Sequence, residues 1–95
     1  MDKELKAKWV AALRSGEYKQ GKTFLRREDN SYCCLGVLLD VAGVDRKKWD
    51  GMCITPFKGG VGNEYLDSCD ASPLANMNDE GKPFTEIADY IEANL

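Results

Sequence analysis

Two groups of side chains in this sequence could carry chemistry. The first is the adjacent thiol pair Cys33 and Cys34, at the start of an apolar run over Tyr32–Gly43. A thiol in the first turn of a helix has its pKa lowered, which favours the nucleophilic thiolate. Cysteine hydrolases usually also use a histidine base, and the chain contains no histidine. Thiols that only pack the interior are therefore the first interpretation, and a small cysteine-dependent enzyme using Cys33 or Cys34 is the alternative.

The second group is a basic stretch in the N-terminal third, interleaved with aromatic and amide side chains. Cations beside rings suit a phosphate or nucleotide ligand, because the cation pairs with the anion while the ring stacks on the base. A solvated basic face is the competing interpretation. If the surrounding chain is a strand, Arg26 and Arg27 point to opposite faces and do not easily join one site. With one aromatic residue of a later loop, the predicted ligand-binding residues are Arg14, Tyr18, Lys19, Gln20, Lys22, Arg26, Arg27 and Trp49.

The cysteine pattern argues against a metal centre. The four cysteines are Cys33, Cys34, Cys53 and Cys69, and they form no CxxC pair. Zinc sites prefer Cys and His ligands in closely spaced pairs. We therefore expect reduced thiols, no metal and no cofactor.

Charge is unevenly distributed along the 95 residues. Residues 1–28 carry eight Lys/Arg against four Asp/Glu, whereas residues 66–95 carry one against seven. Mutual attraction of the two ends is the simplest consequence, and an anion site in the N-terminal third is the functional alternative. The acidic C-terminal third repels phosphate, so we expect no binding to double-stranded DNA. No apolar run approaches the roughly 18 residues of a membrane span, and we expect a cytosolic protein without a membrane contact.

The element that precedes these groups is predicted to be a helix over Asp2–Ser15. Leu5, Trp9 and the pair Ala12-Leu13 form one apolar stripe at helical spacing. Asp2 suits the N-cap, and the following Gly16 suits the left-handed position after the last turn.

Next, an antiparallel β-hairpin is predicted from strands at Thr23–Arg27 and Ser31–Cys33, with its turn at Asp29-Asn30. Two strands alone are marginal, so a helix must pack on them. That helix is predicted at Leu35–Ala42 and ends at Gly43.

The sequence also predicts the contacts of two residues in this central helix. Asp40 lies on its solvent edge or pairs with a base, either Arg14 or an arginine of the hairpin. Gly36 permits a close approach of the first helix at Trp9.

Residues 44–71 form the least regular part of the chain. Met52–Thr55 is a candidate third strand. Trp49 and Phe57 either pin a long loop onto the core or belong to a glycine-rich binding loop. Two C-terminal helices follow, one beginning at Ser72-Pro73 and ending near Met77, the other opened by Pro83. The predicted fold is α+β: a single domain over residues 1–95 with a small antiparallel sheet, a buried central helix and a long loop.

Three segments resemble a family of small proteins from tailed phages and prophages whose activity is not established. The segments are Trp9–Gly21 (WVAALRSGEYKQG), Tyr32–Leu38 (YCCLGVL) and Met77–Ala88 (MNDEGKPFTEIA). Residues 44–71 do not match this pattern. Pro83 stands where the pattern tends to carry a small hydroxyl cap.

The resemblance implies a phage product that acts in the cytoplasm of the bacterial host. By analogy, such proteins act by binding, including inhibition of host defence. The expected function is a non-enzymatic binding protein that sequesters a small anionic, nucleotide-type signal or blocks a host protein. A structural or accessory virion protein is a further alternative, and a homo-oligomer stays open.

Overall fold

The computed structural model of residues 1–95 contains four α-helices, three short 3₁₀ helices and a minimal two-stranded sheet. The α-helices are α1 (Lys3–Ser15), α2 (Cys34–Val41), α3 (Ser68–Asp79) and α4 (Phe84–Asn94). The strands are β1 (Lys19–Gln20) and β2 (Ser31–Tyr32), and the 3₁₀ helices are η1 (Arg46–Lys48), η2 (Thr55–Phe57) and η3 (Val61–Glu64). The predicted order of a first helix, a central helix, a long connection and two final helices is confirmed.

Helix α1 begins and ends at the predicted residues. The Asp2 carboxylate accepts the backbone N–H of Leu5 at 2.8 Å, and Gly16 follows the last turn with a φ of 77°. This left-handed backbone suits glycine because it has no Cβ. The face that α1 buries centres on Trp9, Val10 and Leu13.

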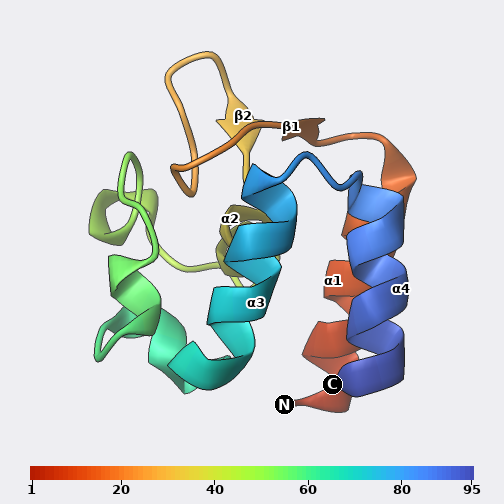
Figure 1. The fold of residues 1–95 in the computed structure, drawn as a ribbon. Helices are drawn as coiled ribbons and strands as arrows, with labels where there is room; N and C mark the ends of the chain where they lie inside the picture. The colour runs from red at the N-terminus through yellow and green to blue at the C-terminus, as the bar shows by residue number, and fades with distance from the viewer.

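Helices α1 and α4 lie side by side and run in opposite directions, which places both chain termini at one end of the molecule (Figure 1). Arg14 in the last turn of α1 donates to Asp89 of α4 at 2.6 Å and to Glu92 of the same helix. The basic beginning and the acidic end of the sequence therefore attract each other directly.

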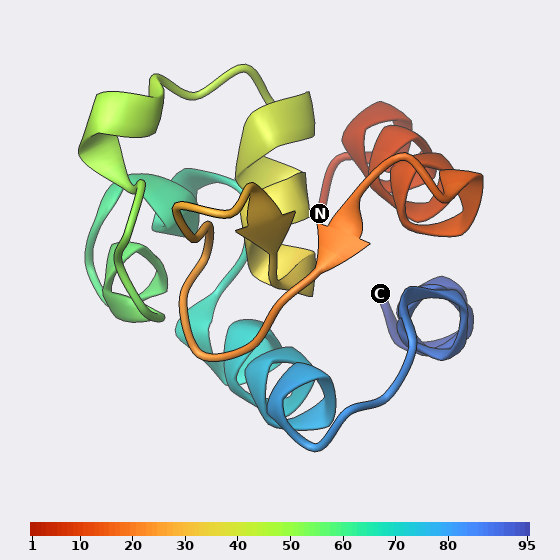
Figure 2. The ribbon, with the colours of Figure 1, turned by 90° about the horizontal axis from the view of Figure 1, so that it is seen from above.

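Helix α2 forms the buried centre of the fold. Seen from above, α1 and α4 are viewed end-on while α2 lies across their direction (Figure 2). Residues 34–39 are all buried, as expected of a helix that is apolar on every side. The indole N–H of Trp9 donates to the carbonyl of Cys34 at 2.8 Å, which fastens α1 to the start of α2.

Gly36 of α2 permits a close approach, but the approaching chain is not α1. A Cβ at this position would lie 1.9 Å from the carbonyl oxygen of Leu25. That carbonyl also accepts the N–H of Cys33 at 3.1 Å. Gly36 therefore makes room for the segment around Leu25.

The predicted antiparallel hairpin is wrong. Strands β1 and β2 pair in parallel, with Lys19 opposite Ser31 and Gln20 opposite Tyr32. Of the hairpin, the turn at Asp29-Asn30 and one antiparallel bridge between Arg26 and Tyr32 remain. Hydrogen bonds from the Arg27 N–H to Ser31 and from the Cys33 N–H to Leu25 flank this bridge.

The cause of this difference lies at the ends of the predicted first strand. Thr23 has a φ of 73°, which breaks the extended chain at its first residue. Leu25 then donates its N–H to Met52, at 2.7 Å, and the Gly51 N–H donates to Arg26 at 3.2 Å. Leu25 and Arg26 thus pair with a segment more than 20 residues away.

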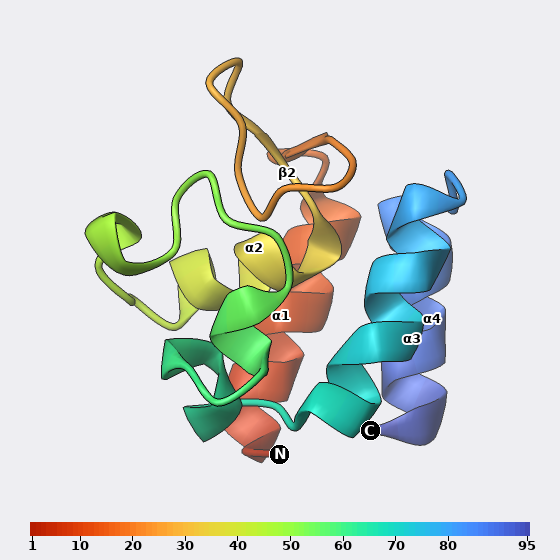
Figure 3. The same ribbon diagram turned by 60° about the vertical axis from the view of Figure 1, so that its left-hand side comes forward.

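Residues 44–71 form a series of short helical turns beside α2 (Figure 3). The candidate third strand at Met52–Thr55 is absent, and η2 begins at its last residue. Trp49 and Phe57 are fully buried and anchor this connection on the core.

Helix α3 begins at Ser68, four residues before the predicted start at Ser72. Pro73 therefore lies inside the helix, where it removes one backbone hydrogen bond. The buried side chains of Ala71 and Leu74 on either side of it hold this turn against the core. Helix α4 follows Pro83 as predicted.

Candidate functional site

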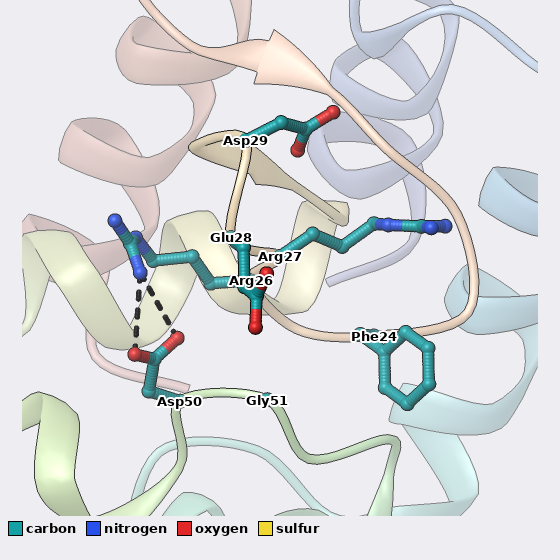
Figure 4. Close-up of a pocket in the computed structure, with 7 residues that line it drawn as sticks. All are labelled: Phe24, Arg26, Arg27, Glu28, Asp29, Asp50 and Gly51. Atoms are coloured by element: carbon teal, nitrogen blue, oxygen red, sulfur yellow. Dashed lines mark hydrogen bonds and ion pairs between the residues drawn. The ribbon is translucent and has the colours of Figure 1, made fainter.

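The chain between β1 and β2 projects from the end of the molecule where α1 finishes and α4 begins (Figure 1). A pocket of about 600 Å³ lies between this loop and the residues after η1 (Figure 4). We call it the loop pocket, and its lining residues are Phe24, Arg26, Arg27, Glu28, Asp29, Asp50 and Gly51.

Arg26 and Arg27 both line the loop pocket, so the expectation that they do not easily join one site is wrong, although their side chains do point apart as expected. The extended pairing ends at Arg26, and Arg27 begins a tight turn by donating its N–H to the carbonyl of Ser31 at 2.9 Å. Asp29 closes that turn, since its carboxylate accepts both the N–H and the hydroxyl of Ser31. Figure 4 shows the two arginine side chains extending in opposite directions from adjacent backbone positions.

Most charges at the loop pocket are already paired. Arg26 reaches both carboxylate oxygens of Asp50, at 3.1 and 3.2 Å. Lys19 lies 3.4 Å from Asp29. Hydrogen bonds from Ser31, with a smaller contribution from Lys19, lower the pKa of Asp29 to about 2. Asp29 is therefore a carboxylate at neutral pH.

Arg27 is the cation of the loop pocket that has no carboxylate within 4.0 Å. Its guanidinium carbon lies 5.8 Å from the centroid of the Phe24 ring, within the range of a cation–π contact. Phe24 is itself 36 % exposed. A free guanidinium and an accessible ring therefore stand together at the mouth of the pocket, with the unpaired carboxylate of Glu28 as the opposing charge.

A cluster of rings supports the loop from behind. Tyr18 meets Tyr32 edge-to-face with ring centroids 4.9 Å apart. The guanidinium carbons of Arg26 and Arg46 each lie 5.9 Å from the Tyr32 ring centroid. Arg46 also donates to the Tyr32 hydroxyl at 2.6 Å. The position of Arg26 is therefore fixed by Tyr32 as well as by its carboxylate partner.

Asp40 pairs with a base, as one of the two expectations had it, but the base is Arg46 of the ring cluster and not Arg14 or an arginine of the loop. It accepts the Tyr18 hydroxyl at 2.5 Å and lies 3.4 Å from Arg46. Burial, and then the hydrogen bond to Asp40, raise the pKa of Tyr18. Tyr18 is thus a neutral, structural group.

The remaining predicted ligand-binding residues lie away from the loop pocket. Arg14 is held on α4, and Gln20 donates to Asn78 and to the Lys82 carbonyl. Lys22 is exposed beside Gly81. Trp49 is fully buried and donates its indole N–H to Val44, so it offers no surface to a ligand.

The thiols at the start of α2 are buried, and their environment favours the neutral form. Desolvation raises the pKa of Cys33 to about 11 and raises that of Cys34 well above its usual value. Desolvation therefore outweighs the effect of the helix N-terminus. Cys53 and Cys69 are exposed.

No three His, Cys, Asp or Glu side chains come together as a metal-binding group. None of the helices has the length and apolar character needed to cross a bilayer.

Five residues of the pocket were missing from the prediction: Phe24, Glu28, Asp29, Asp50 and Gly51. The sequence position of Phe24 could have indicated a place in the site, since it lies between the predicted binding residues Lys22 and Arg26. Nothing in the sequence indicated Asp50, because its position depends on pairing between segments distant in sequence.

The structure is a small helical domain with a projecting loop and a pocket of mixed charge beside that loop. Residues 1–64 match the model of a family described as a domain of unknown function, DUF8296. The chain belongs to this family, and the matched part contains the whole loop pocket. No curated protein and no solved structure matches the chain.

Proposed function

We propose that this protein is a phage-encoded, non-enzymatic binding protein that sequesters a nucleotide-type anion in the loop pocket. Acting in the host cytoplasm, it would deprive a defence pathway of its signal. The phage origin rests on the resemblance of the three sequence segments described above. The ligand class rests on the pocket.

The observation that carries the ligand class is the Arg27–Phe24 pair. The guanidinium has no carboxylate partner, and the ring beside it is exposed. A ligand with a planar base and a phosphate uses both groups, since the base stacks on the ring and the phosphate pairs with the guanidinium. The pocket volume of about 600 Å³ lies within the range of small-molecule sites.

The charge balance of the pocket limits the ligand further. The positive charge of Arg26 is balanced by Asp50, and the negative charge of Asp29 is balanced by Lys19. The remaining charges of the pocket are those of Arg27 and Glu28. Such a pocket favours a ligand with few negative charges, such as a nucleoside monophosphate or a cyclic nucleotide, over a triphosphate.

Calorimetry with a panel of cyclic and linear nucleotides tests this proposal. We expect binding by a nucleotide of low charge that weakens as salt is added. Arg27→Gln should weaken it by about tenfold or more, because a charge-assisted contact is lost. The matched control Lys8→Gln removes a positive charge from the exposed face of α1 and should change the affinity little. Absence of binding by every nucleotide, or equal affinity of the Arg27→Gln variant, would overturn the proposal.

A host protein as target is the second candidate, and one observation favours it. Phe24 and Met52 are exposed large apolar side chains in segments that hydrogen-bond to each other through Leu25. Aromatic, Met and Arg side chains are enriched at protein interfaces. Met52 does not line the loop pocket, so the Met52→Ser variant distinguishes a protein target from a nucleotide target. The substitution should weaken a protein complex and leave nucleotide affinity unchanged.

A further inference from the structure

A second cavity, of about 260 Å³, lies on the other face of residues 23–26. Phe24 and Arg26 line the loop pocket, whereas the alternating residues Thr23 and Leu25 line this second cavity. We call it the inner pocket. Its other lining residues are Cys33, Leu35, Cys53, Ile54, Lys58, Ser72, Ala75, Asn76 and Asp79.

The inner pocket combines an apolar floor with two opposite charges on its rim. Leu25, Leu35 and Cys33 are buried and form part of the floor. Lys58 and Asp79 are exposed and come from different parts of the chain, the residue after η2 and the end of α3. Neither takes part in an ion pair within 4.0 Å, with each other or with any other group.

The carboxylate of Asp79 is held in place. One of its oxygens accepts the backbone N–H of Thr23 at 2.8 Å, which leaves the second oxygen available to a ligand. Thr23 is a β-branched residue with a φ of 73°, a strained backbone that persists only where surrounding contacts impose it. The strain therefore lies on the rim of the pocket and is maintained by the same carboxylate.

We propose that the inner pocket binds a free α-amino acid with an apolar side chain. Lys58 receives the carboxylate of the ligand, and Asp79 receives its ammonium group. The ligand side chain rests on Leu35 and Ile54. The Asn76 amide and the Thr23 hydroxyl supply further hydrogen-bonding groups at the rim.

The size and lining of the pocket favour this class of ligand over larger ones. Pockets for drug-sized molecules begin at about 300 Å³, so the inner pocket suits a smaller molecule. A zwitterion can pair with both Lys58 and Asp79, whereas a ligand with only one charge can pair with one of them. The proposal is independent of the nucleotide-type ligand, because the two pockets share no lining residue.

Calorimetry and amide NMR on the full chain test the proposal with L-leucine, L-isoleucine and L-methionine. Isopentylamine and 4-methylpentanoate are the matched ligands that keep the apolar body with one charge only. We expect at least one amino acid to bind at least tenfold more tightly than both single-charge compounds. Its amide shifts should centre on Thr23, Cys53–Lys58 and Asn76.

Two charge-removing variants complete the test. Asp79→Asn retains an acceptor for the Thr23 N–H, and Lys58→Gln retains a polar chain of similar shape. Each should weaken amino-acid binding at least tenfold without changing the thermal midpoint, whereas the neighbouring controls Glu80→Gln and Lys82→Gln should bind as the parent does. Absence of binding by all three amino acids, equal binding of a single-charge compound, or unchanged affinity of both variants would overturn the proposal.

Discussion

The side-chain oxygen of Asn78, near the end of α3, accepts the backbone N–H of Cys34 at 3.1 Å, across 44 residues of sequence. Asn78 is fully buried. Its amide nitrogen donates to the Gly21 carbonyl at 2.7 Å, and its oxygen also accepts from Gln20. One side chain therefore connects the chain after β1, the first turn of α2 and the end of α3.

Asn78→Ala should destabilise the protein by about 1–3 kcal/mol, because the Cys34 N–H and the Gly21 carbonyl lose their partner in a buried site. Urea unfolding measures this loss. Asn76→Ala, on the exposed side of the same helix, is the matched control and should have a small effect. Equal unfolding midpoints for the two variants would contradict the connecting role of Asn78.

Gly36→Ala should also be destabilising, by about 1–3 kcal/mol, because the added methyl group meets the Leu25 carbonyl and forces the backbone to move. Gly43→Ala is the control, since a Cβ at Gly43 meets no atom and only the left-handed backbone is strained. Amide NMR distinguishes the two variants. Shifts at residues 24–26 should follow the first substitution and not the second.

The contribution of the Asp29 turn to stability should depend on pH. The folded pKa of Asp29, about 2, lies below its ordinary value of 3.8, so its contribution to stability is present above pH 4 and is lost as the pH falls towards 2. Asp29→Asn should therefore reduce the dependence of the thermal midpoint on pH between 4 and 2. The adjacent Glu28→Gln is the control. An unchanged pH dependence in the Asp29→Asn variant would refute this assignment.

Thiol labelling should divide the four cysteines into two pairs. Cys53 and Cys69 are exposed, and a thiol-specific reagent should modify them in the native protein. Cys33 and Cys34 should react only after unfolding, because burial keeps them protonated and inaccessible. Mass spectrometry of digested protein locates the label. Rapid labelling of Cys33 in the native protein would support a nucleophilic role for this thiol.

The α1–α4 contact should be sensitive to salt. Arg14 and its two acidic partners are substantially exposed, so the ion pairs are screened by added salt. Arg14→Gln should lower the thermal midpoint slightly at low salt and have less effect at 0.5 M sodium chloride. Lys8→Gln, on the same helix without an ion pair, should show no such difference. If Arg14→Gln lowers the thermal midpoint equally at both salt concentrations, the cause is lost packing and not lost ion pairs.

The helices could be predicted from sequence because their signals are local. The apolar stripe of α1, the cap at Asp2 and the glycine stops at Gly16 and Gly43 lie within a few residues of the structure they specify. The start of α3 was missed because Pro73 indicated a first turn, whereas the helix begins at Ser68 and the preceding Ala71 is buried in the core.

The sheet and most of the site could not be predicted in the same way. The direction of strand pairing depends on the backbone of Thr23 and on the hydrogen bond between Leu25 and Met52. Neither follows from local composition. Arg26 and Arg27 were identified by residue type, but the turn that brings them to one pocket is set by Asp29.

The alternation along residues 23–26 has a consequence for how the protein responds to its ligands. One short stretch of backbone, residues 23–26, forms a wall of both pockets, with Thr23 and Leu25 on one side and Phe24 and Arg26 on the other. A ligand in one pocket that shifted these four residues would alter the wall of the other pocket, and any resulting change in affinity would be equal in both directions.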